Sequence, residues 1–181
     1  MSSLLDRRLL FVTGKGGVGK TSVASALALM GARAGKRTLV CEVDAKGNLA
    51  DFYGVGPLAF QPTEVQHNLF AMAMNTEESL REYLKLQLKL PLLARLGPIA
   101  RVFDFVATAA PGVKEILTVG KIAYEVRERN YDLVVVDASA SGHVVGQLAS
   151  PVALGELIGV GVVQAQTAWM IDLLKDPATT G

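Results

Sequence analysis

The sequence is poor in cysteine and has no excess of charge of either sign. Cys41 is the single cysteine among 181 residues, which excludes a disulfide within the chain and any metal site or cluster built from four cysteines of one copy. Lysines and arginines number 18 and acidic residues 17, so the net charge of +1 creates no field that would gather nucleic acid. These absences predict a cytoplasmic protein that does not bind nucleic acid directly.

Long uninterrupted hydrophobic runs are also absent, although 50% of the residues are hydrophobic and intrinsic disorder is thereby excluded. The apolar run at residues 9–12 is too short for the core of a signal peptide. Residues 144–163 are numerous enough to cross a membrane, but Pro151, Glu156 and four glycines interrupt them. We therefore expect a single domain over residues 1–181, large enough to bury its own core, and no membrane span.

Apolar runs typical of buried strands alternate with segments of helical character. The predicted strands are residues 9–13, 38–43, 69–74 and 131–136, and the predicted helices are residues 21–34, 75–90 and 113–129. From residue 144 to Pro177 the chain is again apolar and helical in character. This alternation predicts an α/β fold, in which a mostly parallel central sheet has helices on both faces.

A glycine-rich loop lies between the first predicted strand and the first predicted helix. It satisfies the phosphate-loop pattern G-x-x-x-x-G-K-[ST] with Gly14, Lys15, Gly16, Gly17, Val18, Gly19, Lys20 and Thr21. Its glycines allow a tight turn in which backbone N–H groups face an anion at the positive end of the helix. Lys20 is predicted to reach the β- and γ-phosphates of a nucleotide, and the hydroxyl of Thr21 to hold Mg²⁺. The loop therefore favours the three-layer P-loop NTPase fold.

Two aspartates end predicted strands whose carboxyl ends lie beside this loop. Asp137 follows the fourth predicted strand and is predicted to hold Mg²⁺ together with Thr21, directly or through water. Asp44 ends the second predicted strand and is predicted to orient or polarise the attacking water. The alternative for Asp44 is a turn or helix cap within residues 44–48.

Lys15 is a second lysine, at the start of the loop. From that position a lysine cannot easily fold back past the glycines onto its own nucleotide. The loop GKGGVGKT resembles that of the deviant Walker A ATPases, in which the first lysine crosses a dimer interface to the phosphates of the partner. The resemblance implies a dimer, with Lys15 joining Lys20 and Asp44 in catalysis.

Within that class the sequence resembles the family of the arsenite-pump ATPase (ArsA) and the tail-anchored-protein targeting ATPases, and in particular its shorter, actinobacterial-type anion-transporting members. Residues 44–51, DAKGNLAD, look like the first switch of the family, DPAHNLSD, and residues 111–115, PGVKE, are similar to its PGxxE helix start. Residues 137–143, DASASGH, look like its second switch, DTAPTGH, in which Gly142 is placed to sense the γ-phosphate. The resemblance covers nearly the whole chain and implies that the protein uses ATP and Mg²⁺.

The sequence departs from the family's pattern in both switches. Ala138 and Ala140 stand where the second switch has Thr and Pro, and Gly47 stands where the first has His, which bears on the rate of hydrolysis. The metalloid site of the arsenite pump uses several cysteines, so arsenite is disfavoured as the substrate. Residues 176–181 look like the lead-in to a further strand. By the length of the family the chain is expected to be truncated, with the residues that recognise the base beyond its last residue.

The resemblance implies a dimeric switch, either a homodimer or a heterodimer with a paralogous ATPase, that couples ATP hydrolysis to a hydrophobic client or a membrane-protein partner. Such a protein is cytoplasmic, or peripheral at the membrane through its partner. A first alternative is a weakly or non-hydrolytic regulatory subunit that acts with a paralogous ATPase, which the altered switches permit. A second is a positioning ATPase similar to MinD or ParA, although the sequence shows no basic amphipathic C-terminal helix that would bind a membrane.

Overall fold

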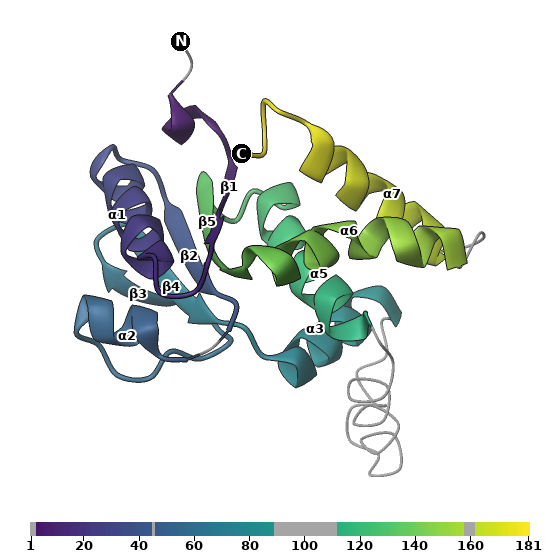
Figure 1. Ribbon diagram of the computed structural model, residues 1–181, viewed down its shortest axis with the longest axis horizontal. Helices are drawn as coiled ribbons and strands as arrows, with labels where there is room; N and C mark the ends of the chain where they lie inside the picture. Colours follow the sequence, from purple (N-terminus) through teal and green to yellow (C-terminus); the bar gives the residue numbers. More distant parts are fainter. Residues whose placement is uncertain (1–2, 45, 89–111, 158–161) are drawn as a thin grey trace.

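Five strands form one sheet at the centre of the protein, seen in a computed structural model that describes residues 3–44, 46–88, 112–157 and 162–181 (Figure 1). The strands are β1 (Leu9–Gly14), β2 (Thr38–Glu42), β3 (Thr63–Gln66), β4 (Leu69–Ala73) and β5 (Leu133–Ala140). Their order is β1-β5-β2-β4-β3, and all neighbours are parallel except β3, which pairs antiparallel with β4. The mostly parallel sheet of the predicted α/β fold is therefore confirmed.

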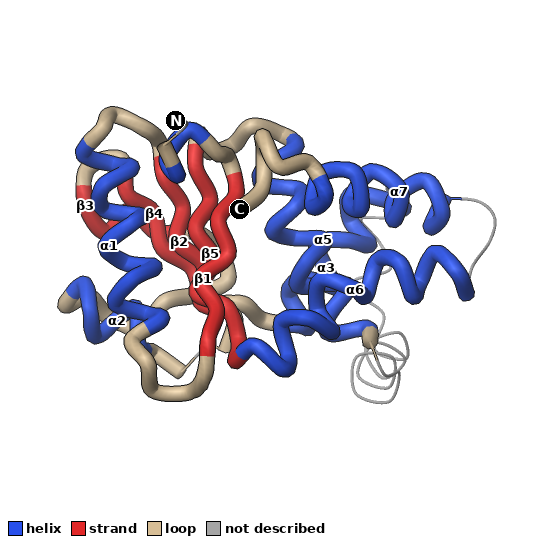
Figure 2. Tube along the Cα trace, turned by 45° about the horizontal axis from the view of Figure 1, so that its top comes forward, coloured by secondary structure: helices blue, strands red, loops and turns tan. Residues whose placement is uncertain are grey.

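Helices cover both faces of this sheet, as Figure 2 shows from a second direction. They are α1 (Lys20–Arg33), α2 (Asn48–Tyr53), α3 (Thr76–Leu88), α5 (Val113–Arg127), α6 (Ser141–Leu157) and α7 (Val162–Lys175), and a 3-10 helix at Leu4–Asp6 precedes β1. The helices α1 and α2 lie on one face, and α3, α5, α6 and α7 lie on the other. The result is the three-layer arrangement of the P-loop NTPase fold.

Alternate side chains of the buried strands enter two separate cores, one on each face of the sheet. Leu10 and Val135 pack with the alanines of α1, whereas Leu9 and Val134 pack with Ile122 and other residues of α5. Complete burial of a leucine or valine stabilises the fold by about 1.5–3 kcal/mol. Because both faces are covered, the strands have the continuous apolar runs from which the sequence predicted them.

Several element boundaries differ from the prediction. β5 does not end before Asp137 but continues to Ala140, because β1 extends beside it and pairs Val12 with Asp137 and Gly14 with Ala140. The apolar region after residue 144, predicted to be helical in character, contains α6 and α7, of which α6 begins at Ser141. α2 and β3 were not predicted, since both are short and lack a clear apolar period.

The ends of the remaining helices lie close to their predicted positions. α5 begins at Val113, after Gly112 with a left-handed φ of 87°, and ends at Arg127, two residues before the predicted end. α3 begins at Thr76, whereas its predicted end at residue 90 and the first residue of the PGVKE segment lie outside the described residues. Within the part of the chain that the structure describes, no helix combines the length and the apolar composition that crossing a membrane requires.

The last residues of the chain lie alongside β1. Thr180 forms a parallel bridge with Leu9, and the N–H of Gly181 donates to the carbonyl oxygen of Leu9 at 3.0 Å. Arg7 also donates to the carbonyl oxygen of Thr180 at 2.7 Å. Residues 176–181, predicted as the lead-in to a strand, therefore meet the outer side of β1, the strand at one end of the sheet order.

Candidate functional site

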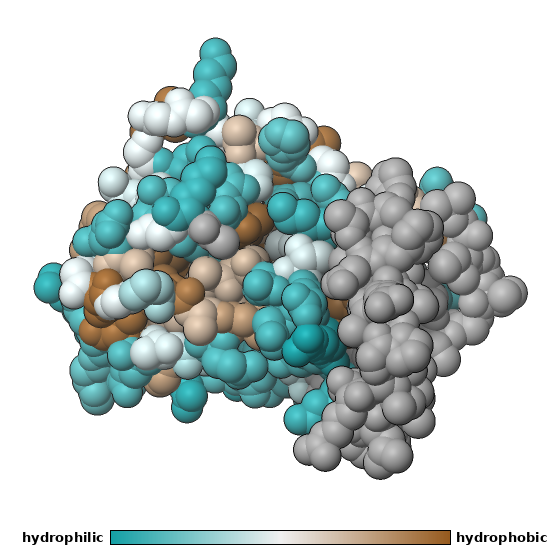
Figure 3. Space-filling model, turned by 90° about the horizontal axis from the view of Figure 1, so that it is seen from below, coloured by the Kyte–Doolittle hydropathy of each residue, from teal (hydrophilic) through white to brown (hydrophobic). Residues whose placement is uncertain are grey.

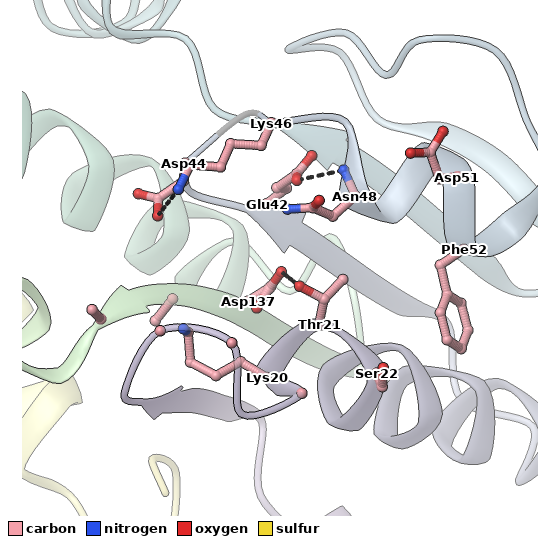
Figure 4. A pocket seen from close by; sticks show the side chains of 15 residues that line it. Lys20, Thr21, Ser22, Glu42, Asp44, Lys46, Asn48, Asp51, Phe52 and Asp137 are labelled. Carbon is pink, nitrogen blue, oxygen red and sulfur yellow. Dashed lines mark hydrogen bonds and ion pairs between the residues drawn. The ribbon is translucent and has the colours of Figure 1, made fainter.

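A cavity of about 660 Å³ opens at the carboxyl ends of the parallel strands. Its lining residues come from three segments far apart in the sequence: the glycine-rich loop with the start of α1 (Gly16, Gly17, Gly19, Lys20, Thr21 and Ser22), the end of β2 and the residues through α2 (Glu42, Asp44, Lys46, Asn48, Asp51 and Phe52), and β5 (Asp137, Ala138 and Ala140). The close-up in Figure 4 shows how side chains of these segments converge on one space. The cavity lies where open α/β sheets bind their ligands.

The glycine-rich loop presents backbone and open space to this cavity. Gly17 and Gly19 have left-handed φ angles of 76° and 92°, which residues with a side chain rarely adopt. A Cβ atom added at Gly16, Gly17 or Gly19 would meet no atom within 4 Å, so the space above the loop is unfilled. Gly19 is also the N-cap of α1 and offers no side-chain acceptor to the first N–H groups of the helix. This arrangement suits an anion such as a phosphate.

Lys20 lies at the start of α1 and lines the cavity. Its Nζ donates to the carbonyl oxygen of Lys15 at 3.3 Å, so the side chain lies over its own loop. A lysine at this position can place one positive charge against the phosphates that the loop would receive.

Thr21 of α1 and Asp137 of β5, the two residues predicted to hold Mg²⁺, contact each other. The hydroxyl of Thr21 donates to Oδ2 of Asp137 at 2.6 Å. Burial of Asp137 removes water from its carboxylate and raises its pKa above the ordinary range, against the opposing effects of the Thr21 hydrogen bond and the charge of Lys20. A hydroxyl and an incompletely compensated carboxylate are hard oxygen ligands, so the two residues fit Mg²⁺.

Replacement of Asp137 by asparagine is expected to stabilise the nucleotide-free protein at neutral pH and to weaken Mg·ATP binding by at least about tenfold. The carboxyl group has a higher pKa in the folded chain than in the unfolded one. The folded state therefore binds more protons in the window above pH 3.8, and the stability that this group contributes falls as the pH rises through that window. A neutral asparagine side chain, which does not titrate, would remove this dependence.

Thermal unfolding between pH 4 and pH 7 measures the effect of Asp137→Asn, with the exposed Asp172→Asn as the matched control. Calorimetric titration with ATP in the presence of Mg²⁺ measures the loss of affinity. Lower stability of the Asp137→Asn variant at neutral pH, or unchanged affinity for Mg·ATP, would contradict the prediction.

Asp44 is held by the second switch segment. Its Oδ1 accepts a hydrogen bond from the hydroxyl of Ser139 at 2.8 Å, and its Oδ2 lies 3.7 Å from Nζ of Lys46. The Asp44 side chain is 43% exposed, so one edge of the carboxylate faces the cavity and solvent. Ser139 is buried and receives a weaker contact from Gln147 at 3.4 Å, which fixes it between β5 and α6. Asp44 is therefore positioned by a tertiary contact and open to a water molecule.

The turn after Asp44 is capped by a different carboxylate. The backbone N–H groups of Gly47 and Asn48 donate to the Glu42 carboxylate, at 3.2 and 2.9 Å. Within the described residues, no contact supports the alternative that Asp44 caps this turn. Sequence reasoning missed Glu42. Its only signal was an acidic residue inside an otherwise apolar strand.

The cavity brings together most, but not all, of the residues predicted for the site. Gly16, Gly17, Gly19, Lys20, Thr21, Asp44 and Asp137 line it. Gly14, Lys15, Val18 and Gly142 are not among the lining residues. Gly14 ends β1, Lys15 is exposed, Val18 is 63% exposed, and Gly142 is an exposed residue in the first turn of α6. Lys46, Asn48, Asp51 and Phe52 line the cavity and were not assigned a role from the sequence.

Comparison with known proteins relates the chain to a family and to longer relatives. The family of ArsA ATPases, described as anion-transporting ATPases, matches residues 7–180. ATPase BagA of Mycobacterium tuberculosis is 33% identical over 189 residues, which cover 98% of this chain and 56% of the relative. ATPase GET3 of Podospora anserina is 30% identical over 156 residues, covering 83% of this chain and 46% of the relative. ATPase ASNA1 homolog 1 of Paramecium tetraurelia is 32% identical over 147 residues, or 78% and 43% of the two chains. The chain thus spans about half the length of these curated relatives.

Proposed function

Because the chain belongs to the family of ArsA anion-transporting ATPases, we propose that it binds ATP with Mg²⁺ in the cavity at the carboxyl ends of β1, β2 and β5 and hydrolyses it. The observation that carries this proposal is the 2.6 Å contact between Thr21 and Asp137 beside the open glycine-rich loop. Two segments 116 residues apart thereby supply the hydroxyl and the carboxylate that Mg·ATP requires.

The loop and the start of α1 hold the phosphates. The N–H groups at the start of α1 donate to phosphate oxygens, and Lys20 neutralises charge on the β- and γ-phosphates. Thr21 and Asp137 would hold Mg²⁺. The bound metal ion supplies positive charge against the phosphate oxygens, which favours transfer of the γ-phosphoryl group.

Asp44 orients the nucleophile. Its Oδ2 edge accepts a hydrogen bond from a water molecule, while Ser139 holds Oδ1. The oxygen of that water forms a bond to the γ-phosphorus as the bond to the β–γ bridging oxygen breaks. The two protons of the water stay on the oxygens of the phosphate that forms, and ADP and phosphate leave. Restriction of the water to this orientation is the contribution of Asp44 to the rate.

We further propose that two subunits, of this protein or of this protein and a paralogous ATPase, close over their nucleotides. Lys15 is exposed and lies outside the cavity lining, which supports an action on the site of a partner. Val18 and Phe52 are 63% and 49% exposed. Figure 3 shows that hydrophobic residues lie among hydrophilic ones on the face seen from below. Apolar side chains next to a charged site suit a contact that forms on closure. Readout of this closure by a hydrophobic client or a membrane partner completes the proposal.

Mixing two inactive variants tests the proposed function and the dimer together. Lys15→Ala and Asp44→Asn are each expected to lose most ATP hydrolysis, whereas the mixed dimer should regain up to about half of the activity per site. If Lys15 acts on the partner, one site of the mixed dimer keeps both groups and the other loses both. Phosphate release with each protein alone and with the mixture is the measurement.

Recovery on mixing supports the dimeric ATPase. Native mass spectrometry establishes that mixed dimers form, and without recovery in their presence Lys15 acts within its own subunit. Absence of Mg²⁺-dependent hydrolysis by the unmodified protein, alone and with a paralogous ATPase, would refute the proposed function itself.

A weakly hydrolytic regulatory subunit is the second candidate. Ala138 and Ala140 line the cavity with methyl groups, so β5 offers the γ-phosphate no hydroxyl at these two positions. This lining favours the binding of ATP over its hydrolysis. Tight binding of Mg·ATP with turnover only in the presence of a paralogous ATPase distinguishes this candidate from the first.

A further inference from the structure

One buried carboxylate that lines the cavity has no part in the mechanism proposed above. Glu42, the last residue of β2, is 1% exposed, and it pairs across the sheet with Ala73 of β4 and Asp137 of β5. In the described part of the chain no lysine or arginine forms an ion pair with it. A buried carboxylate without a cationic partner depends on hydrogen bonds for its stability, so its acceptor bonds carry particular weight.

Both oxygens of this carboxylate bind the start of α2. Oε2 of Glu42 accepts from the N–H of Gly47 at 3.2 Å. Oε1 accepts from the N–H of Asn48 at 2.9 Å, as Figure 4 shows. Gly47 is the N-cap of α2, has a left-handed φ of 81° and offers no side chain to the free N–H groups of the helix. Glu42 therefore supplies the cap from the sheet itself.

Hydrogen bonds hold both ends of the segment that carries Asp44. At its first end, the carbonyl oxygen of Glu42 accepts from the N–H of Met74 at 2.8 Å, and the N–H of Val43 donates to the carbonyl oxygen of Asp137 at 3.2 Å. At its far end, the Glu42 carboxylate holds Gly47 and the residue after it. Asp44 therefore lies between two positions that hydrogen bonds hold in place, and its side chain contacts Ser139.

We propose that Glu42 is a positioning residue for hydrolysis. It sets the backbone of the first switch segment, which carries Asp44, and through it the placement of the Asp44 carboxylate. The inference rests on the proposed function and deepens it. Without the Glu42 anchor, the far end of the segment samples conformations in which Asp44 does not face the water that it should orient. Catalysis depends on placement to within a fraction of an ångström, whereas the phosphate-binding groups proposed above belong to the glycine-rich loop and the start of α1. Glu42 thus affects turnover and leaves nucleotide affinity nearly unchanged.

Amide exchange in the nucleotide-free protein tests the anchor directly. Glu42→Gln keeps the size of the side chain but turns one acceptor into a donor, and it should speed exchange at the amides of Gly47 and Asn48 by about tenfold or more. Glu64→Gln is the matched control, because Glu64 also accepts a backbone N–H, from Asn68 at 3.1 Å, but on the exposed strand β3. Unchanged exchange at residues 47 and 48 in Glu42→Gln would overturn the inference.

Steady-state ATPase kinetics test whether the anchor acts through Asp44. Glu42→Gln should lower kcat by about tenfold with KM within about threefold, and Glu42→Ala should lower kcat further. Added to Asp44→Asn, the same Glu42→Gln change should leave kcat within about twofold, since no carboxylate is left to position. Thermal unfolding establishes that each variant folds, and the isosteric glutamine decides the result if the alanine variant does not fold.

The outcomes separate the two ideas. A further tenfold fall in the double variant, or a parallel loss of affinity and rate in Glu42→Gln, overturns the positioning role. If the unmodified protein does not hydrolyse ATP, the proposed function fails, and amide exchange alone then decides whether Glu42 anchors the segment.

Discussion

Lys20→Ala is expected to weaken the affinity for Mg·ATP by about a hundredfold or more and to abolish hydrolysis. The side chain starts at the first residue of α1, lines the cavity and lies over its own loop, with Nζ at 3.3 Å from the carbonyl oxygen of Lys15. No backbone N–H can replace a full positive charge against the β- and γ-phosphates. Removal of the ammonium therefore affects both binding and the step in which charge develops on the leaving phosphate.

Calorimetric titration and phosphate release measure the two effects of Lys20→Ala. Lys175→Ala, at the exposed end of α7, is the control for a general loss of positive charge. Affinity and turnover like those of the unmodified protein would show that the glycine-rich loop does not receive the nucleotide.

Asp44→Asn should cut turnover by roughly a hundredfold while Mg·ATP affinity stays within a few-fold. Asparagine has the same size as aspartate and keeps an oxygen that can accept from Ser139, so the switch segment should remain in place. It lacks the negative charge that draws and orients the water. The effect therefore falls on kcat and spares the binding of the phosphates.

Single-turnover rates and equilibrium affinity together decide the role of Asp44. The exposed Asp172→Asn variant should match the unmodified protein in both. Equal losses of affinity and rate in Asp44→Asn would instead make Asp44 a ligand of the metal ion or a structural residue.

Some of this protein could be predicted from its sequence because the signals are local. Strands buried on both faces have unbroken apolar runs, which located β1, β2, β4 and β5 without knowledge of their partners. The glycine-rich loop and the lysine and threonine that follow it belong to one short segment, so their proximity needs no tertiary contact. The sheet with helices on both faces and the family resemblance followed from these elements.

What only the tertiary structure decided depends on which segments become neighbours. β5 inserts between β1 and β2, and this order brings Asp137 to Thr21 and Ser139 to Asp44 across distances of 116 and 95 residues in the sequence. The length of β5 beyond Asp137 depends on the extension of β1 beside it. No local sequence pattern predicts this strand order.

The role of Glu42 and the pKa of Asp137 depend on burial, which is a property of the packed molecule. The sequence contains Glu42 as an acidic residue in an apolar run, and only the packed sheet excludes it from water and leaves the N–H groups of α2 as its partners. In the same way, the raised pKa of Asp137 follows from desolvation by its surroundings. The sequence by itself thus located the glycine-rich loop with its lysine and threonine, whereas the fold decided which carboxylates line the same cavity and which one caps α2, because hydrogen bonding and dielectric environment arise only from packing.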